Sequence, residues 1–232
     1  MNRIRQKIGR KGSLRWIQVA IENHRQALNE AISTAARTSP NVEWLSPLRE
    51  DSYAEYRDEG SLRLLGLNPA ALPLPLHKFW PAKGPQWDAL GRTERGELIL
   101  LEAKSHIPEL KSVCGATDAR SLRLIKASLD RTKAYLGVEQ SMDWMRPFYQ
   151  YANRLAHLHY LNALNKADAV LIFLYFMNDP DQNGPTTQGE WEAASSVVRM
   201  TLGLPKKIRQ RRVANVFIDV GNWAGEVASK SR

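Results

Sequence analysis

The sequence predicts an α/β fold in which helices flank a mixed β-sheet, with helical additions at the N-terminus. Three short apolar runs, typical of buried strands, indicate the sheet: residues 97–104, 169–176 and 213–220. Apolar residues repeat at helical spacing over residues 14–37 and 117–136. The chain has 232 residues, of which 43% are hydrophobic and 25% charged, so it is expected to be globular and to bury a large core.

Two helices are predicted before the sheet. The first covers residues 14–37, with Ser13 as its N-cap. A connector marked by prolines follows. The second helix is predicted from about Asp51 to Leu65 and ends at Gly66.

The region before the first apolar run is predicted to be extended. Prolines between residues 69 and 75 impose an irregular link, and His77 to Trp80 is the candidate first strand. After Gly84-Pro85, residues 86–91 are predicted to pair as an antiparallel hairpin with residues 97–104, because only a short turn separates them.

Helices and strands alternate through the second half of the chain. The helix over residues 117–136 is closed by Gly137, and another helix follows from residue 148 to 159. The strand at residues 169–176 is apolar on both faces and is therefore predicted to be central. A helix over residues 190–202 precedes the last strand.

The most informative stretch joins the apolar run at residues 97–104 to charged residues. Four consecutive aliphatic residues precede Glu102-Ala103-Lys104. Side chains alternate along a strand, so Glu102 and Lys104 are expected on one face and Ala103 on the other. The hairpin would bring Asp88 close to Glu102. Two carboxylates would then meet a lysine, and oxygen ligands of this kind suit Mg²⁺.

This pattern resembles the PD-(D/E)XK nuclease superfamily, which has the restriction-endonuclease-like fold. Asp88 matches the first acidic residue of the motif, and Glu102-Ala103-Lys104 matches its E-x-K. The resemblance implies metal-dependent cleavage of phosphodiester bonds by an endo- or exonuclease. Asp88, Glu102 and the carbonyl of Ala103 would hold Mg²⁺, with Mn²⁺ as the alternative. Lys104 would orient the attacking water or stabilise charge on the phosphate.

The resemblance implies two further site residues. Nuclease-fold proteins often supply a metal-site carboxylate from the helix before the first strand, and Glu55 is the candidate. Glu22 is the reserve, and Glu50 and Glu59 remain alternatives. RecB-like nucleases carry a glutamine on the helix after the E-x-K strand, which Gln150 resembles. The alternative interpretation of Gln150 is an ordinary polar helix face.

The net charge of +9 at pH 7 is concentrated in two segments without acids. The first contains Arg3, Arg5, Lys7, Arg10 and Lys11. The second contains Lys206, Lys207, Arg209, Arg211 and Arg212. Such segments suggest a nucleic-acid partner, with DNA favoured over RNA. We favour phosphate contact for the second segment, whereas the first is equally well explained as a solubilising tail.

Other interpretations compete with a nuclease. Glu102 and Lys104 could form a solvated ion pair at a strand end. A second E-x-K, Glu109-Leu110-Lys111, follows Pro108 without a strand and is interpreted as surface decoration. The chain could also be a catalytically inactive nuclease-fold module that binds nucleic acid or protein, or a structural nucleoprotein subunit.

Composition bounds the cellular setting and the domain organisation. The longest apolar run is too short to span a bilayer, the N-terminal residues are polar and basic, and the single cysteine, Cys114, excludes an internal disulfide framework. A cytoplasmic setting is therefore expected. We divide the chain into a basic arm (1–12), one nuclease-like domain (13–222) and a tail (223–232). A homodimer or a protein partner remains an open alternative.

Overall fold

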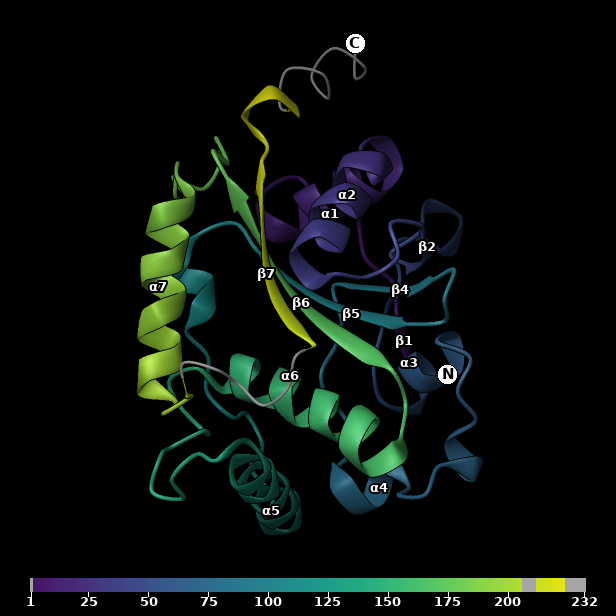
Figure 1. The fold of residues 1–232 in the computed structure, drawn as a ribbon, viewed down its shortest axis with the longest axis vertical. Helices are drawn as coiled ribbons and strands as arrows, with labels where there is room; N and C mark the ends of the chain where they lie inside the picture. The colour runs from purple at the N-terminus through teal and green to yellow at the C-terminus, as the bar shows by residue number, and fades with distance from the viewer. Residues whose placement is uncertain (1, 206–211, 224–232) are drawn as a thin grey trace.

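The computed structural model describes residues 2–205 and 212–223, which form a mixed α/β fold around a five-stranded sheet (Figure 1). The strand order is β2-β4-β5-β6-β7. The strands are β2 (Val42–Ser46), β4 (Ala89–Thr93), β5 (Leu98–Lys104), β6 (Ala169–Met177) and β7 (Val213–Asp219). The three predicted apolar strands are therefore present in one sheet, and β5 lies in its middle.

The sheet is antiparallel on one side of β5 and parallel on the other. Strand β4 pairs antiparallel with both β2 and β5, while β5, β6 and β7 run parallel. Ala89 lies opposite Leu101, which confirms the predicted hairpin. The predicted bounds need correction, because the first strand of the hairpin begins at Ala89 and continues to Thr93.

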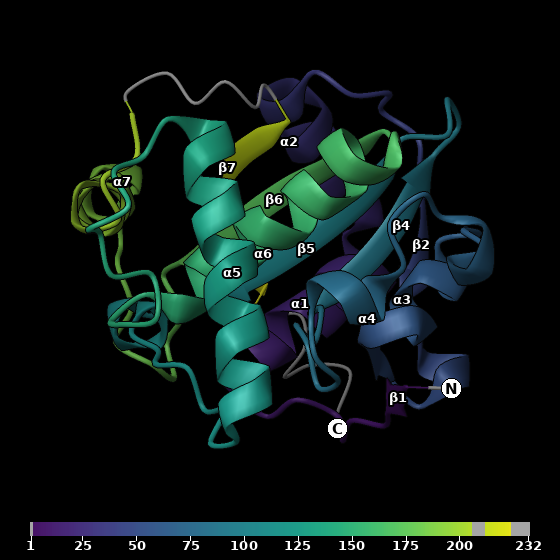
Figure 2. The ribbon, with the colours of Figure 1, turned by 90° about the horizontal axis from the view of Figure 1, so that it is seen from below.

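Helices cover both faces of the sheet (Figures 1 and 2). One layer contains α1 (Gly12–Asn23) and α2 (Arg25–Ala36). The other contains α5 (Ala119–Leu136), α6 (Tyr149–His159) and α7 (Gln188–Thr201). Each layer buries its own hydrophobic cluster against the strands, so β5 and β6 are covered on both faces.

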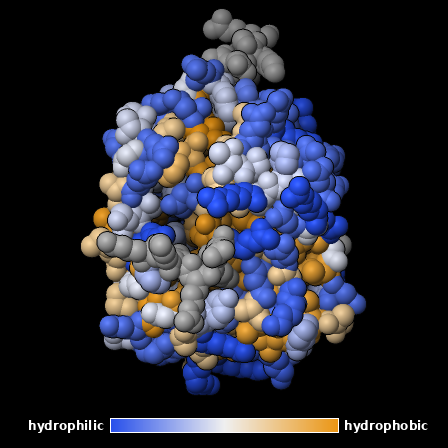
Figure 3. All heavy atoms as spheres, viewed as in Figure 1, coloured by the Kyte–Doolittle hydropathy of each residue, from blue (hydrophilic) through white to orange (hydrophobic). Residues whose placement is uncertain are grey.

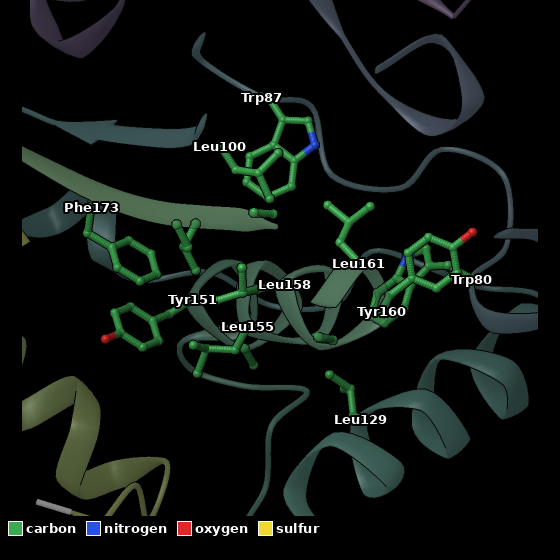
Figure 4. Packing of buried hydrophobic residues seen from close by; sticks show 14 of the residues in the cluster. Trp80, Trp87, Leu100, Leu129, Tyr151, Leu155, Leu158, Tyr160, Leu161 and Phe173 are labelled. Atoms are coloured by element: carbon green, nitrogen blue, oxygen red, sulfur yellow. The ribbon is translucent and has the colours of Figure 1, made fainter. Parts of the chain in front are cut away.

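The layer formed by α5 and α6 follows the predictions. Asp118 accepts a hydrogen bond at the start of α5, and Gly137 ends the helix with φ of 74°. On α6, Tyr151 stacks on Phe173 of β6 with ring centroids 4.1 Å apart, and Leu155 lies in the same core (Figure 4). The apolar side of α6 therefore faces the sheet, as its spacing predicts.

The single helix predicted over residues 14–37 is wrong, because the chain forms two helices that meet at His24. His24 leaves helical geometry with φ of −128° and ψ of 32°, and Lys11 rather than Ser13 occupies the N-cap of α1. Helix α1 contacts β5, whereas α2 contacts β7. Because the sheet twists, a bend between two short helices lets both bury their apolar sides.

The helix predicted from Asp51 to Leu65 is also wrong. The chain forms a 3₁₀ turn (Arg49–Asp51), strand β3 (Glu55–Tyr56) and helix α3 (Asp58–Leu64). Ser52 and Tyr53 adopt left-handed φ values, which stop a helix. Strand β3 instead pairs with β1 (Arg3–Ile4), so the N-terminal arm is part of the folded body.

The strand predicted for His77 to Trp80 is a short helix, α4 (Leu76–Phe79), which begins after Pro75. Pro75 is the N-cap residue and is extended, with φ of −60° and ψ of 141°, so the helix begins at the residue after it. The hydroxyl of Ser128 on α5 donates a hydrogen bond to the carbonyl of Phe79 and holds α4 in place. The first strand of the five-stranded sheet in chain order is instead β2.

The surface is largely polar on the face shown in Figure 3, with smaller groups of apolar residues between the polar ones. None of the helices in the described residues combines the length and the apolar character needed to cross a bilayer. Most of the buried apolar residues belong to the sheet and to its two helix layers.

Candidate functional site

The end of β5 brings together the charged residues of the E-x-K pattern. Glu102 is 3% exposed and Lys104 is half-buried, with its Nζ 2.6 Å from Glu102 Oε1. Ala103 points the other way, into the core covered by α1 and α2. The alternation predicted from the sequence is therefore present. The side chains of Lys104 and Glu102 are only 12% and 3% exposed, which contradicts the interpretation as a solvated ion pair.

Asp88 lies directly before β4 and beside this pair. Its Oδ2 accepts a hydrogen bond from the backbone N–H of Ala103 at 2.7 Å. Burial and the negative charge of Glu102 raise the pKa of Asp88 well above its usual range, although Lys104 opposes this shift. The structure thus brings Asp88, Glu102 and Lys104 together, with two carboxylates that repel each other.

Glu55 joins these residues from a strand rather than from the expected helix. It is 5% exposed, and its Oε2 accepts hydrogen bonds from Gln86 and, at 2.9 Å, from Gln6. Burial raises the pKa of Glu55 despite these bonds, and the charge of Glu102 raises it further. We refer to Glu55, Asp88 and Glu102 as the carboxylate cluster.

The alternative glutamates are placed elsewhere. Glu22 interacts with Tyr53 and helps to raise the pKa of that phenol, after the larger effect of burial. Glu59 pairs with Arg63 at 2.7 Å, and Glu50 is exposed. Of the four candidate glutamates, Glu55 is therefore the one that interacts electrostatically with both Asp88 and Glu102.

Gln150 reaches the cluster from the first turn of α6. Its Oε1 accepts a hydrogen bond from Lys104 Nζ at 3.2 Å, and its backbone N–H donates to Ser112 Oγ at 2.8 Å. The position implied by the resemblance to RecB-like nucleases is therefore next to Lys104. Because the backbone of Gln150 is fixed by Ser112, its side chain is well placed to orient the lysine.

Arg154 is a residue of the site to which sequence reasoning assigned no role. Its Nε donates to Glu102 Oε2 at 2.6 Å and its Nη2 to the carbonyl of Gln86 at 2.7 Å. The guanidinium lies 4.7 Å from the centre of the Trp87 ring, and Trp87 itself packs above α6 (Figure 4). The available signal was spacing, because Arg154 is four residues after Gln150 on one helix face.

The two cations set the ionisation of the buried glutamate. Burial opposes ionisation of Glu102, but Arg154 and Lys104 outweigh burial and hold the pKa of Glu102 below its usual range. Burial likewise disfavours the charged form of Lys104, but Glu102 and Asp88 outweigh it and raise the pKa of Lys104. Three buried or half-buried carboxylates thus face two cations, which leaves Asp88 the least compensated.

The donor set suits a hard divalent cation only in part. Across residues 2–205 and 212–223, no three His, Cys, Asp or Glu side chains gather closely enough to hold a metal by themselves. The candidate ligands are the carboxylates of Asp88 and Glu102 and the carbonyl of Ala103, and both oxygens of Glu102 already accept hydrogen bonds, from Lys104 and from Arg154. Mg²⁺ is commonly held by one or two carboxylates together with water and substrate oxygens, so the set fits Mg²⁺ in that form.

The second E-x-K serves the loop after β5. Glu109 lies on a 3₁₀ turn (Ile107–Leu110), where it accepts a hydrogen bond from the backbone N–H of Ser105 at 3.0 Å. Its Oε1 is 3.0 Å from His106 Nδ1. Glu109 is half-buried and fixes this loop, so the interpretation as surface decoration is incomplete.

The basic segment predicted to contact phosphate lies mostly outside the described residues, which do not include 206–211. Arg212 is described, and its guanidinium pairs with Glu97 at 2.8 Å and with Asp168 at 2.7 Å. These partners lie at the end of β5 opposite to Lys104. Phosphate contact by Lys206, Lys207, Arg209 and Arg211 stays a prediction.

No family model, curated protein or solved structure matches this chain. The carboxylate cluster and the cations beside it are therefore the features of this chain from which a function can be inferred.

Proposed function

We propose that this protein is a metal-dependent nuclease with a restriction-endonuclease-like fold, acting on DNA or, as the alternative, on RNA. One observation carries the proposal: Asp88, Glu102 and Lys104 meet at the end of β5, where burial and then the negative charge of Glu102 raise the pKa of Asp88. Carboxylates crowded in this way are typical of functional sites, because a purely structural site gains nothing from the repulsion.

Asp88, Glu102 and the carbonyl of Ala103 are the residues that would hold Mg²⁺, and Glu55 is the candidate further carboxylate. When bound, the ion would polarise the phosphate and lower the pKa of a bound water. The second oxygen of Asp88, Oδ1, accepts no hydrogen bond from a described side chain or backbone group, since the bond from Ala103 goes to Oδ2. This oxygen is therefore available to a cation.

Lys104 is suited to act on the phosphate or on the attacking water. Its ammonium has three N–H donors, of which Glu102 and Gln150 accept two. Its raised pKa keeps the ammonium charged at neutral pH. The remaining donor can hold a water or stabilise the negative charge that develops on the phosphate.

A nuclease assay tests the proposal directly. Purified protein would be incubated with single- and double-stranded DNA and RNA in Mg²⁺, Mn²⁺ or chelator. We expect cleavage with either metal and none with chelator. Cleavage that survives chelation, or no cleavage of any substrate by the wild-type protein, would reject the proposal.

A second function, binding without catalysis, is favoured by Arg154. Together with Lys104, this arginine places a cation against each oxygen of Glu102, so the glutamate is neutralised without metal. Isothermal titration with Mg²⁺ separates the two functions. For a nuclease, the wild-type protein should give a heat of Mg²⁺ binding that Asp88→Asn loses. For a binding module, the two proteins should give the same result.

A further inference from the structure

The N-terminal arm crosses the end of the sheet at which the carboxylate cluster lies. Gln6 contacts Glu55 of the cluster at 2.9 Å. Six residues later the chain reaches Gly12, where an added Cβ would lie 3.7 Å from Ser105 Oγ and 3.6 Å from Glu109 Oε1. Ser105 directly follows Lys104. The segment between β1 and α1, seen at the lower edge of Figure 2, therefore runs from one side of the cluster to the other. We call residues 5–11 the basic strap.

The backbone of the basic strap is fixed to α1. The N–H of Gly9 donates to Gln18 Oε1 at 2.8 Å, and Gln18 Nε2 donates to the carbonyl of Lys7 at 3.1 Å. Gln18 is 4% exposed. A Cβ on Gly9 would lie 2.5 Å from the backbone of Arg15, so only glycine permits this close approach. The strap is thus a built part of the fold rather than a loose tail.

The charged side chains of the strap are accessible to solvent. Its four cations are exposed, and none of them forms an ion pair with a residue that the structure describes: Arg5, Lys7, Arg10 and Lys11. The flanking arginines differ, because Arg3 pairs with Asp51, and Arg15 with Asp181 at 2.5 Å. Exposed cations held on a fixed backbone and left without acidic partners are available to an external polyanion.

We infer that the basic strap is the surface that holds the phosphate backbone of a nucleic-acid strand beside the carboxylate cluster. The proposal rests on the proposed function for what happens at the cluster, but binding by the strap does not require catalysis. The cluster alone would repel a polyanion, and a row of cations next to it offsets that repulsion. Contacts of this kind position a strand without reading its sequence.

The test compares binding by wild-type protein with binding by Lys7→Gln/Arg10→Gln/Lys11→Gln. Fluorescein-labelled 20-mers of single-stranded DNA, duplex DNA and single-stranded RNA would be titrated by anisotropy in EDTA, which prevents metal-dependent cleavage. Loss of three phosphate contacts should lower affinity about 100-fold and reduce the slope of log affinity against log salt by about 2 to 3. The three side chains are exposed and form no hydrogen bond or ion pair with a residue that the structure describes, so stability should change little.

The matched control is Arg37→Gln/Arg95→Gln/Lys166→Gln. These cations are also exposed, and the variant loses the same charge. They lie at the opposite end of β5: Arg37 is the C-cap of α2, two residues before Ser39, which bonds to Glu97; Arg95 lies in the turn between β4 and β5, and Lys166 lies just before β6. We expect its affinity and salt slope to stay near wild type. Equal losses in both variants, an unchanged strap variant, or no binding by wild-type protein would each overturn the inference.

Cleavage assays separate this inference from the nuclease proposal. If the strap variant loses binding while wild-type protein cleaves nothing, the strap stands and the nuclease proposal fails. If wild-type protein cleaves and the strap variant binds and cleaves equally well, the strap inference fails alone.

Discussion

A buried glutamate directly precedes strand β5, and another lies near its end; the surroundings of the two glutamates differ. Glu97, at the start, is 7% exposed and pairs with Arg212, while Glu102, near the end, is 3% exposed and pairs with Arg154. The pKa of each glutamate lies below its usual range, because hydrogen bonds and the arginine outweigh burial. The additional acid beside Arg212 is Asp168, whose side chain is 55% exposed.

The Glu102 end instead holds further carboxylates in the interior. Asp88 and Glu55 lie beside Glu102, and burial together with mutual repulsion raises the pKa of both. A buried glutamate with an arginine is therefore compatible with a purely structural role, as at Glu97. Uncompensated like charges are the property that distinguishes the candidate site.

The largest difference between the two ends should appear in cleavage. Lys104→Ala is expected to reduce metal-dependent cleavage by about 10²- to 10⁴-fold, because it removes the group that we propose acts on water or phosphate. Glu97→Gln, at the other end of the strand, should leave the rate unchanged. Single-turnover assays with circular dichroism as a folding control would measure this.

Because Lys104 is half-buried, a second variant guards against misfolding. Lys104→Gln keeps a hydrogen-bonding side chain of similar length and should fold like wild type while remaining inactive. A Lys104→Gln protein that cleaves at the wild-type rate would remove the lysine from the mechanism.

Loss of Arg154 should lower the stability of the protein more than loss of Arg212. Arg154→Met is expected to lower the free energy of unfolding by about 3 to 5 kcal/mol, because it leaves Glu102 buried beside Asp88 with only Lys104 as a partner. Arg212 has a side chain 34% exposed, so Arg212→Met should cost about 1 kcal/mol or less. Urea unfolding of both variants tests this, and equal losses would contradict the comparison.

Metal binding should depend only on the end of β5 at which Glu102 lies. A bound ion at 100 times its dissociation constant stabilises a protein by about 2.7 kcal/mol. We expect such a gain from Ca²⁺ or Mg²⁺ in wild type, in Lys104→Ala and in Glu97→Gln, measured by thermal unfolding. Asp88→Asn keeps the shape but loses the charge, so it should lose most of the gain. Full stabilisation of Asp88→Asn would exclude Asp88 as a metal ligand.

The smallest effect concerns pH, and it has opposite signs at the two ends. The pKa of Asp88 is raised on folding. The contribution of Asp88 to the free energy of unfolding is therefore fully present below its unfolded pKa of about 3.9, and it is lost as pH rises through the folded-state pKa. Relative to wild type, Asp88→Asn should therefore become more stable as pH rises. The pKa of Glu97 is lowered, so its contribution is present above about 4.3 and is lost as pH falls.

As pH falls, the free energy of unfolding of Glu97→Gln should accordingly decrease less than that of the wild type. Denaturant unfolding of wild type and both variants between about pH 3 and 8 would give the two difference curves. Slopes of the same sign would contradict the structure, because they would show that the pKa values of the two carboxylates shift in the same direction on folding.

The features that the sequence predicted correctly are local ones. The apolar runs of β5, β6 and β7, and the end of α5 at Gly137, follow from neighbouring residues. The hairpin places Asp88 against Ala103, because a short turn leaves little freedom in register.

The features that it missed depend on partners far along the chain. Glu55 was expected on a helix, but β3 forms because residues 3 and 4 pair with it, and periodicity around residue 55 carries no sign of that partner. Likewise, the polar face of α6 was visible, whereas the selection of Arg154 for Glu102 depends on how α6 lies on the sheet.

The position of β5 has a consequence for motion. This strand lies between β4 and β6, and helices cover both of its faces. Amide hydrogens in such a strand exchange with solvent mainly when the whole domain unfolds, whereas surface segments open locally and often. We therefore expect the amides of Glu102 and Lys104 to exchange among the slowest of the described residues. We also expect the geometry of these two residues to be kept through local fluctuations, so that a nucleic-acid strand bound at the proposed site would have to adapt to it.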